Sequence, residues 1–271
     1  MKNHSLHYSS TNTYLVSGSG GVLLFDTGWA GTFRSFCSEM GRVGIPVQRI
    51  SYILISHFHP DHYGIAQEIA EYGPTIVVMD VQREHIHTAD AILQREPEKR
   101  FRPIDDERIR IVSIDSSRSF LQEMGIAGEI LSTPGHSEDS ISLCLDDGSI
   151  FVGDLNPLYE LEMHRGTTIG KSWERLLSRN PKTIYYGHAP VEKMEESAAK
   201  QDTGKKRRDA SQEYALVKRI IRYTDKGCSA EWIKDKTGVE TGWIKDVMRM
   251  YLTHTDISVQ GILDRMEIRG K

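Results

Sequence analysis

The residues of this chain best suited to chemistry are His57, His59, Asp61 and His62, which lie within six positions. They directly follow the apolar run 50–55, so we expect them in a loop at the end of a strand. Imidazole nitrogens and carboxylate oxygens are ligands that Zn²⁺ and similar divalent ions accept. His57 and His59 can hold one ion from one side of an extended turn, while Asp61 and His62 follow at an offset that favours a second. The spacing therefore predicts a site for two metal ions.

Three further ligand candidates stand where later apolar runs end, namely His136, Asp154 and His188. Another acidic residue, Asp26, ends an earlier apolar run in the same way. The stretch 141–152 alternates in the manner of a β-hairpin, with Asp-Asp-Gly at its turn. This hairpin is expected to bring His136 and Asp154 to the same edge of a sheet.

This ordered set of motifs closely resembles the metallo-β-lactamase superfamily over roughly residues 10 to 195. The resemblance implies an α/β fold, a four-layer αβ/βα sandwich of two similar halves, with the metal site along the shared edge of its two sheets. It also implies how the ligands divide between the ions. The first ion is held by His57, His59 and His136, the second by Asp61, His62 and His188, and Asp154 bridges the two.

Asp26 lies outside this ligand set. The resemblance implies that it orients the ligand histidines or the loop that carries them, as outer carboxylates do in metal sites. A cap for the helix that follows is the alternative role.

The reaction that these ligands imply is metal-assisted hydrolysis. A hydroxide shared by the two ions attacks an ester, thioester or lactone carbonyl of a small-molecule acyl substrate, because coordination lowers the pKa of water from about 15.7 to roughly 7. Asp154 and Asp61 are the expected catalytic residues, since Asp154 holds both ions and Asp61 can accept and pass on a proton. Zn²⁺ is the expected metal for this ligand set, with iron and manganese as alternatives.

Two other functions stay open. In the first, a phosphodiesterase or nuclease, the same ions activate water against phosphorus and the basic C-terminal part of the chain holds a nucleic-acid strand. In the second, the chain has the same fold but binds or senses a ligand and catalyses no reaction. The intact set of seven ligands argues against the second.

Departures from other branches of the superfamily narrow the choice. Asp154 stands where many β-lactamases of the fold have Cys, and His59 stands where the flavo-diiron branch has Glu. Only 33 residues separate Asp154 from His188, so the large nuclease cap of the mRNA-processing branch is absent. The pattern is most similar to glyoxalase II, acyl-homoserine lactonases and related thioesterases.

The elements that must position these residues follow from hydrophobic periodicity and turn residues. Strands are expected in a hairpin over 13–25 and over 50–55, 75–79, 109–112, 128–132, 141–145 and 149–152, and helices over 31–43 and 64–71. The charged segment 81–106 is expected to cover the site, as such connections often do. The segment 156–166 directly follows Asp154 and is expected to contact substrate. The candidates for substrate contact are Tyr63, Asn156, Tyr159, His164 and Arg165.

The chain of 271 residues is expected to form a catalytic domain over 1–195 and a charged linker with a helical module over 196–271. The module's helices, over 213–223, 229–236 and 242–252, and a strand over 261–268 loosely resemble a winged helix-turn-helix. From Lys200 onward, 16 Lys and Arg outnumber 11 Asp and Glu. A basic tail permits nucleic-acid contact. We favour packing onto the catalytic body or a homodimer through these helices, because residues such as Trp232 and Trp243 give them apolar faces that so small a module cannot easily bury alone.

The cysteines and the apolar segments indicate in which cellular compartment the protein is expected. The three cysteines, Cys37, Cys144 and Cys228, lie far apart, and an odd count argues against a disulfide framework. The first residues contain no apolar signal region, and no apolar run approaches the length that spans a bilayer. We therefore expect a cytoplasmic protein with no membrane association.

Overall fold

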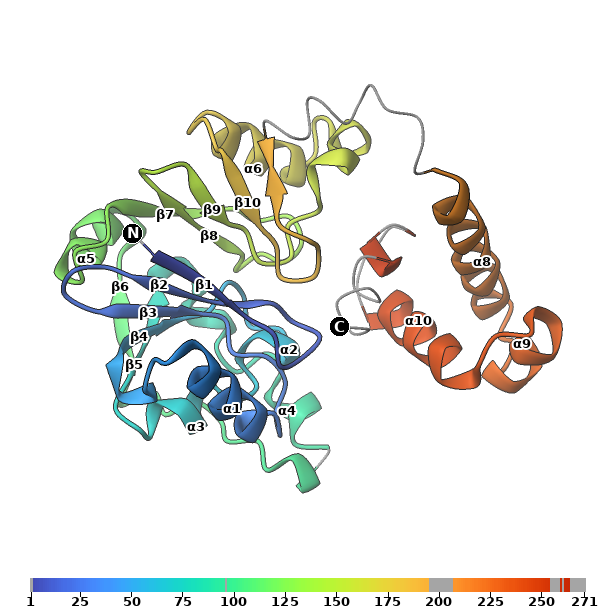
Figure 1. The fold of residues 1–271 in the computed structure, drawn as a ribbon, viewed down its shortest axis with the longest axis horizontal. Helices are drawn as coiled ribbons and strands as arrows, with labels where there is room; N and C mark the ends of the chain where they lie inside the picture. Colours follow the sequence, from blue (N-terminus) through green and yellow to red (C-terminus); the bar gives the residue numbers. More distant parts are fainter. Residues whose placement is uncertain (1, 96, 195–206, 254–258, 260, 264–271) are drawn as a thin grey trace. The chain divides into compact units, whose positions relative to one another are not determined.

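The structure, a computed structural model, describes residues 2–95, 97–194, 207–253, 259 and 261–263. The chain divides into two compact units, Met1–Met194 and Glu195–Lys271. Figure 1 shows both sheets in the first unit and the helices α8, α9 and α10 in the second.

Two mixed sheets form the centre of the first unit. The first has the order β1-β2-β3-β4-β5-β6 and consists of Lys2–Leu6, Thr13–Ser17, Val22–Phe25, Ile50–Leu54, Thr75–Met79 and Arg110–Val112. The second has the order β11-β10-β9-β8-β7, where β7 to β11 are Gly128–Ser132, Ile141–Leu145, Ser149–Phe151, Thr183–Tyr185 and Glu192–Lys193. Because β3, β4 and β5 pair in parallel, their carboxyl ends meet at one edge of the first sheet.

The two sheets face each other across one apolar core. Leu23, Phe25 and Leu54 of the first sheet pack there with Leu143 and Phe151 of the second. Side chains alternate between the faces of a strand, so the neighbouring residues point to the outer side of each sheet. Each outer face therefore needs its own apolar cover.

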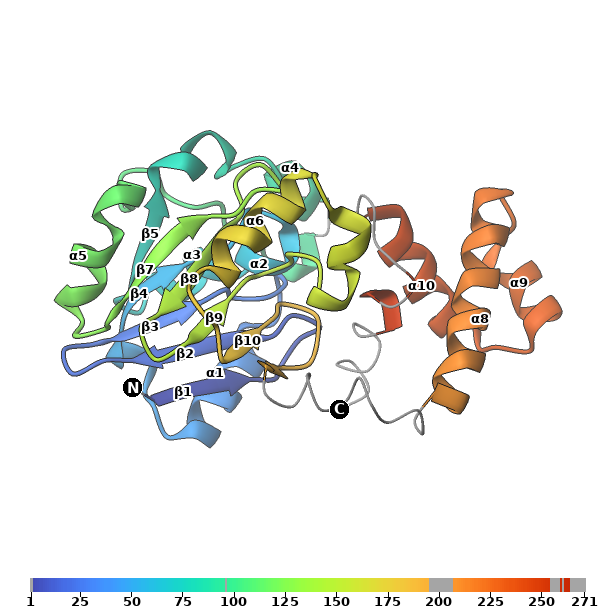
Figure 2. The same ribbon diagram turned by 90° about the horizontal axis from the view of Figure 1, so that it is seen from above.

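Helices supply that cover. The α-helices of this unit are α1 (Phe33–Val43), α2 (Pro60–Tyr63), α3 (Ala66–Ala70), α4 (Asp90–Leu93), α5 (Ser117–Glu123) and α6 (Thr168–Leu177), and the short 3₁₀ helices are η1 (Val47–Arg49), η2 (Asp80–His85), η3 (Pro97–Lys99), η4 (Ile114–Ser116) and η5 (Leu158–His164). Phe36 and Met40 of α1 belong to the core on the outer face of the first sheet, and Trp173 and Leu176 of α6 to the core on the outer face of the second. Figure 2 shows α6 over β8, β9 and β10. The predicted four-layer αβ/βα sandwich is confirmed.

Individual elements match the predictions unevenly. The strands predicted over 75–79, 128–132 and 141–145 lie at those residues. β1 was not predicted, because its sequence KNHSL carries no apolar alternation. α6 was also omitted, although its first turn is capped by Thr167, whose Oγ1 accepts the Gly170 N–H at 3.3 Å.

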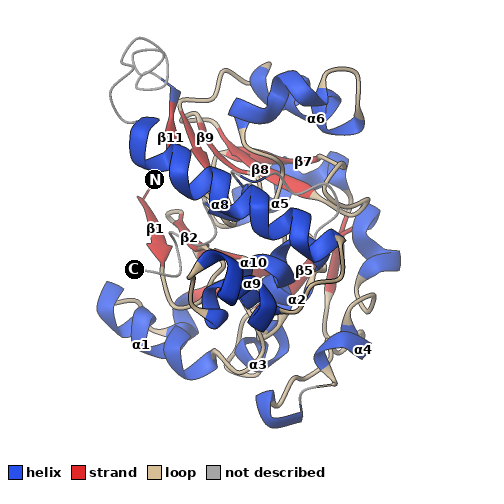
Figure 3. Cartoon of the chain, turned by 90° about the vertical axis from the view of Figure 1, so that its right-hand side faces the viewer, coloured by secondary structure: helices blue, strands red, loops and turns tan. Residues whose placement is uncertain are grey.

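The second unit contains the helices α8 (Arg207–Asp225), α9 (Ala230–Thr237) and α10 (Thr241–Thr253), drawn in blue with the other helices in Figure 3. Ser229 caps α9 by accepting the Trp232 N–H, and the predicted helices are present. The predicted strand over 261–268 is wrong for 261–263, which are helical, and its remainder lies outside the described residues.

These helices bury most of their apolar side chains in a core of their own, which includes Val217, Ile220, Ile233, Ile244 and Val247. The premise that the module cannot bury its apolar faces is therefore wrong, although Trp232 stays 41% exposed. Across the described part of the whole chain, the helices are too short or too polar to cross a membrane.

Candidate metal centre

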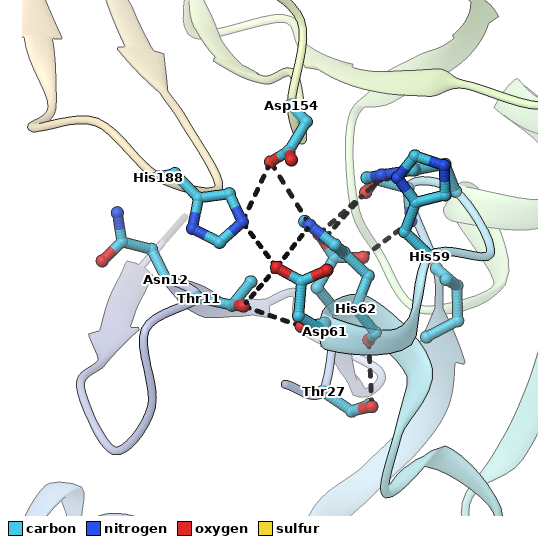
Figure 4. A network of polar contacts seen from close by, with 12 residues as sticks. Thr11, Asn12, Thr27, His59, Asp61, His62, Asp154 and His188 are labelled. Atoms are coloured by element: carbon cyan, nitrogen blue, oxygen red, sulfur yellow. Dashed lines mark hydrogen bonds and ion pairs between the residues drawn. The ribbon is translucent and has the colours of Figure 1, made fainter. Parts of the chain in front are cut away.

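Each predicted ligand lies just beyond the carboxyl end of a strand, at one edge of the first unit. His57 and His59 follow β4, and Asp61 and His62 open the helix α2, which begins with Pro60. The loops after β7, β9 and β10 supply the remaining three, His136, Asp154 and His188. Figure 4 shows Asp154 and His188 turned toward Asp61 and His62.

The structure brings the seven side chains into three overlapping groups. The groups are His57, His59 and His136; His57, His62 and Asp154; and Asp61, His62 and His188, with the ligand atoms of each group within 4.8 Å of one another. The two oxygens of Asp154 face different groups. Its Oδ2 lies 3.6 Å from His136 Nε2, whereas its Oδ1 lies 3.3 Å from His62 Nε2 and 3.4 Å from His188 Nε2.

These spacings fit the coordination shell of a metal ion. Two ligand atoms about 2.1 Å from one ion at a tetrahedral angle lie roughly 3.4 Å apart. The Asp154 distances are close to this value, and His59 Nδ1 lies 3.0 Å from His136 Nε2. The Nε2 of His57 is buried and has no hydrogen-bond partner among the described residues. A divalent cation would satisfy this nitrogen, so the residues present fit a metal centre.

Hydrogen bonds on the far side of the rings direct three histidines toward the centre. His188 Nδ1 donates to the Ser10 carbonyl at 2.8 Å, which leaves the lone pair of His188 on Nε2. His62 Nδ1 lies 2.9 Å from Asp26 Oδ2 and donates to that carboxylate. His57 Nδ1 lies 3.0 Å from the Ser56 hydroxyl, which itself donates to Asp26. In each case the nitrogen nearer the centre is the one that can bind metal.

Asp26 is fully buried and is the common partner of Ser56 and His62. Its carboxylate accepts the Ser56 N–H at 2.7 Å and the Ser56 O–H at 2.9 Å, besides His62 Nδ1. Its backbone φ of 62° is uncommon for a residue with a side chain and is typical of functional sites. The helix that follows begins after Thr32, so Asp26 does not cap that helix.

Charge is distributed unequally over the centre. Burial lowers the pKa of His57 and of His59, so both rings are neutral. Burial also disfavours a charged His62, but the carboxylates of Asp154, Asp26 and Asp61 outweigh it and raise its pKa well above the ordinary value. Burial opposes charge on Asp61 as well, yet His62 and His188 hold its pKa below the ordinary value. This concentration of carboxylates is the environment that a divalent cation would neutralise.

Several contacts of the centre were not predicted. Thr11 donates to the Asp61 carbonyl at 2.7 Å, and Ser56 and Ser10 support the histidines. Asp139 accepts the Phe58 N–H at 2.7 Å. These residues carry no motif of their own, and most of their partners lie far away in the sequence, so spacing could not have found them.

The described polar contacts of Tyr63, Asn156 and His164 are made with residues other than the seven ligands. Tyr63 is buried in the core on the outer face of the first sheet, and its hydroxyl donates to Asp90 at 2.8 Å. Asn156 donates to Glu160 at 2.8 Å, and His164 Nε2 lies 3.9 Å from the same carboxylate. Arg165 is exposed at the end of η5. The side chain of Tyr159 lies outside the described residues, and all five roles stay predictions.

Comparison with known proteins places this architecture in a family. Residues 8–188 match the metallo-beta-lactamase superfamily. A protein of Methanocaldococcus jannaschii named as a probable metallo-hydrolase is 31% identical over 54% of this chain and 66% of its own length. The beta-lactamase-like protein 2 homolog of Drosophila melanogaster is 27% identical over 67% of this chain and 59% of its own length. The chain spans about half the length of the curated relatives it matches.

Solved structures share the fold. A metallo-beta-lactamase family protein from Thermus thermophilus superimposes with a TM-score of 0.56 at 17% identity, covering 99% of this chain and 94% of that one. The protein TTHA1623, solved in a di-iron-bound form, has a TM-score of 0.52 at 21% identity over 69% of this chain and 92% of its own. Because the family match covers strands β2 to β10 and every ligand loop, this chain belongs to the metallo-β-lactamase superfamily.

Proposed function

We propose that this chain is a dinuclear metal-dependent hydrolase that cleaves an ester, thioester or lactone bond of a small acyl substrate. The observation that carries the proposal is the position of Asp154, whose two carboxylate oxygens face different ligand groups. A bridging ligand must do this, whereas a mononuclear site needs only one of the two groups.

The residues divide into two sets around that bridge. His57, His59 and His136 would hold one ion, and Asp61, His62 and His188 the other. When bound, such ions supply Lewis acidity and lower the pKa of water toward about 7. Zn²⁺ is the default for these ligands, and the di-iron form of TTHA1623 makes iron the first alternative to test, ahead of manganese.

Neighbouring residues of the chain hold Asp61 in place and keep it ionised. Asp61 is buried, and its Oδ2 lies 2.8 Å from His188 Nε2. Thr11 holds the same residue through its carbonyl at 2.7 Å and reaches its carboxylate at 3.4 Å. Because the pKa of Asp61 lies below its ordinary value, the carboxylate is ionised near neutral pH, as a ligand of a divalent ion must be.

The choice of a carbonyl substrate rests on Asp154 standing where many β-lactamases have Cys, and on the similarity of the motifs to glyoxalase II and lactonases. The direct test is turnover by the metal-loaded protein of a panel of thioesters and lactones, against a bis-aryl phosphodiester and a single-stranded RNA. We expect hydrolysis of at least one acyl substrate and its loss in Asp154→Ala. Cleavage of the phosphodiester or RNA alone would favour the nuclease alternative.

A further inference from the structure

We propose that Asp139 is a positioning residue of the first metal site, which locks the loop carrying His57 and His59 to the loop carrying His136. The inference rests on the metal centre of the proposed function and is independent of its substrate class. Asp139 holds no ligand position and acts through the backbone of Phe58, which stands between the ligands His57 and His59.

The central contact of Asp139 is with the backbone between His57 and His59. The N–H of Phe58, the residue between His57 and His59, donates to Asp139 Oδ2 at 2.7 Å. Both partners are buried, with Asp139 4% and Phe58 2% exposed. A hydrogen bond from a backbone N–H to an ionised carboxylate is stronger than a neutral one, and a buried N–H left without a partner costs about 1–3 kcal/mol. The carboxylate therefore fixes the peptide that joins the two histidines.

Asp139 is itself rigidly joined to His136. The Thr133 N–H donates to the Ser140 carbonyl at 2.8 Å, which closes the loop at its two ends. Inside it, the Ser137 N–H donates to Ser140 Oγ at 3.2 Å, and the two hydroxyls lie 2.7 Å apart. Because the loop is closed in this way, His136 and Asp139 keep a fixed position relative to each other.

Gln82 provides a second connection between the same loops. Its side chain is fully buried, and its Nε2 donates to the Ile55 carbonyl at 3.0 Å and to the Asp139 carbonyl at 3.1 Å. The Ile141 N–H adds a bond to the Ser56 carbonyl at 2.9 Å. These bonds join the two loops independently of the Asp139 carboxylate. Removing the carboxylate should therefore loosen the backbone between His57 and His59 without separating the two halves of the fold.

The effect should be confined to one ion. The ligands of the first site come from the two loops that Asp139 joins. The second site depends on other supports, because Asp26 holds His62, Ser10 holds His188 and Thr11 holds Asp61. Loss of the Asp139 side chain should therefore lower the affinity of the first site for its ion and leave the affinity of the second site unchanged.

The test isolates each site before removing Asp139. In a His188→Ala background the first site remains intact, and in a His136→Ala background the second retains its three ligands. Zn²⁺ affinity of the metal-free full chain is measured in each background by competition with a chelator. We expect Asp139→Ala to weaken binding by about 10- to 100-fold in the first background, the usual effect of removing an outer-shell partner, and to leave the second unchanged. Asp139→Asn, which keeps an oxygen to accept the Phe58 N–H, should restore most of the affinity.

Ser117→Ala is the matched control for a general loss of stability. Ser117 Oγ accepts the buried Ile130 N–H at 3.1 Å and has no hydrogen bond to a ligand loop among the described residues, so this variant should keep both affinities. Should Asp139→Ala not fold, Asp139→Ser takes its place, since its hydroxyl ends one bond short of the carboxylate oxygens. The inference would be overturned if Asp139→Ala lowered the Zn²⁺ affinity equally in both backgrounds, or if Asp139→Asn lowered it as much as Asp139→Ala does. Failure of both backgrounds to bind Zn²⁺ with Asp139 intact would overturn the metal centre, and the inference with it.

Discussion

At the scale of single residues, the centre depends on which nitrogen of each imidazole carries its proton. The Ser10 carbonyl can only accept a hydrogen bond, so it places a proton on Nδ1 of His188 and turns Nε2 toward the centre. Asp26 does the same for His62 directly and for His57 through Ser56. In each of the three rings the nitrogen that faces the centre is therefore the one that can bind an ion, and His62, whose pKa is raised, must first release a proton.

Replacement of Asp154 tests the bridge. Asp154→Ala removes the only side chain whose oxygens face both ligand groups in the described part of the chain, so hydrolysis should fall by roughly a thousandfold, comparable to the loss of a major electrostatic group in an active site. Steady-state kinetics on the best acyl substrate measure this. Asp147→Ala changes an aspartate in the exposed turn before β9 and should leave the rate unaltered. Activity of Asp154→Ala within about tenfold of the original would show that the bridge is assigned incorrectly.

The candidate ligands can be recognised in the sequence because their signal is local. His57, His59, Asp61 and His62 stand in one short motif that needs no knowledge of the fold. Asp139 could not be predicted, since the Phe58 N–H that it accepts lies 81 positions earlier in the chain. Outer contacts of this kind exist only after the two halves have packed.

At the scale of elements, α2 and α4 are connected by a polar cluster outside the metal centre. Tyr63 at the end of α2 donates to Asp90 at the start of α4. His87 lies between two carboxylates, with Nδ1 2.8 Å from Asp90 and Nε2 3.0 Å from Asp106. Burial lowers the pKa of His87, but its hydrogen bonds to Asp106 and Asp90 outweigh burial and raise the pKa above 6.5.

The raised pKa predicts a pH dependence of stability. A protonated His87 is stabilised in the folded chain, so its contribution is fully present below the ordinary value of 6.5 and is lost as the pH rises through the folded-state pKa. The difference in unfolding free energy between the original chain and His87→Gln should therefore be largest near pH 6 and shrink toward about pH 9. Denaturant unfolding over this range measures it.

His85→Gln serves as the control, because no carboxylate among the described residues forms an ion pair with His85. A difference for His87→Gln that stays constant with pH, or that grows as the pH rises, would contradict the assignment of His87 as a charged partner of the two aspartates.

Strand prediction succeeded where an apolar run is bounded by turns and failed where no such run exists. The strands β5, β7 and β8 were found at their exact bounds because each is bounded by turns and rich in apolar residues. β1 was missed because its stability comes from antiparallel pairing with β2, from Lys2 against Ser17 to Leu6 against Thr13, and not from an apolar face of its own. Such pairing is a tertiary property that local sequence does not carry.

At the scale of the whole molecule, each of the two units has its own core. The three apolar clusters of Met1–Met194 contain no buried residue of the second unit, and the cluster of Glu195–Lys271 contains none of the first, as far as the described residues extend. All seven ligands belong to the first unit. The metal centre should not need the second unit for its formation.

A chain that ends after Met194 should therefore bind metal as the full chain does. We further propose that the second unit acts in assembly, through side chains such as Trp232 and Leu252, which stay 41% and 68% exposed. Metal content, acyl turnover and size-exclusion mass of the truncated and full chains test both statements. An unchanged mass, together with loss of a salt-sensitive RNA or DNA affinity present in the full chain, would favour nucleic-acid binding instead.

The central claim is that one chain holds a dinuclear centre, and the most direct measurement is its metal content. The full chain is produced separately with excess zinc, iron and manganese, desalted, and analysed for metal per mole of protein. We predict close to two ions per chain for at least one of these metals, as expected of a two-metal hydrolase, and fewer for Asp154→Ala. At most one tightly held ion under every condition would contradict the dinuclear centre.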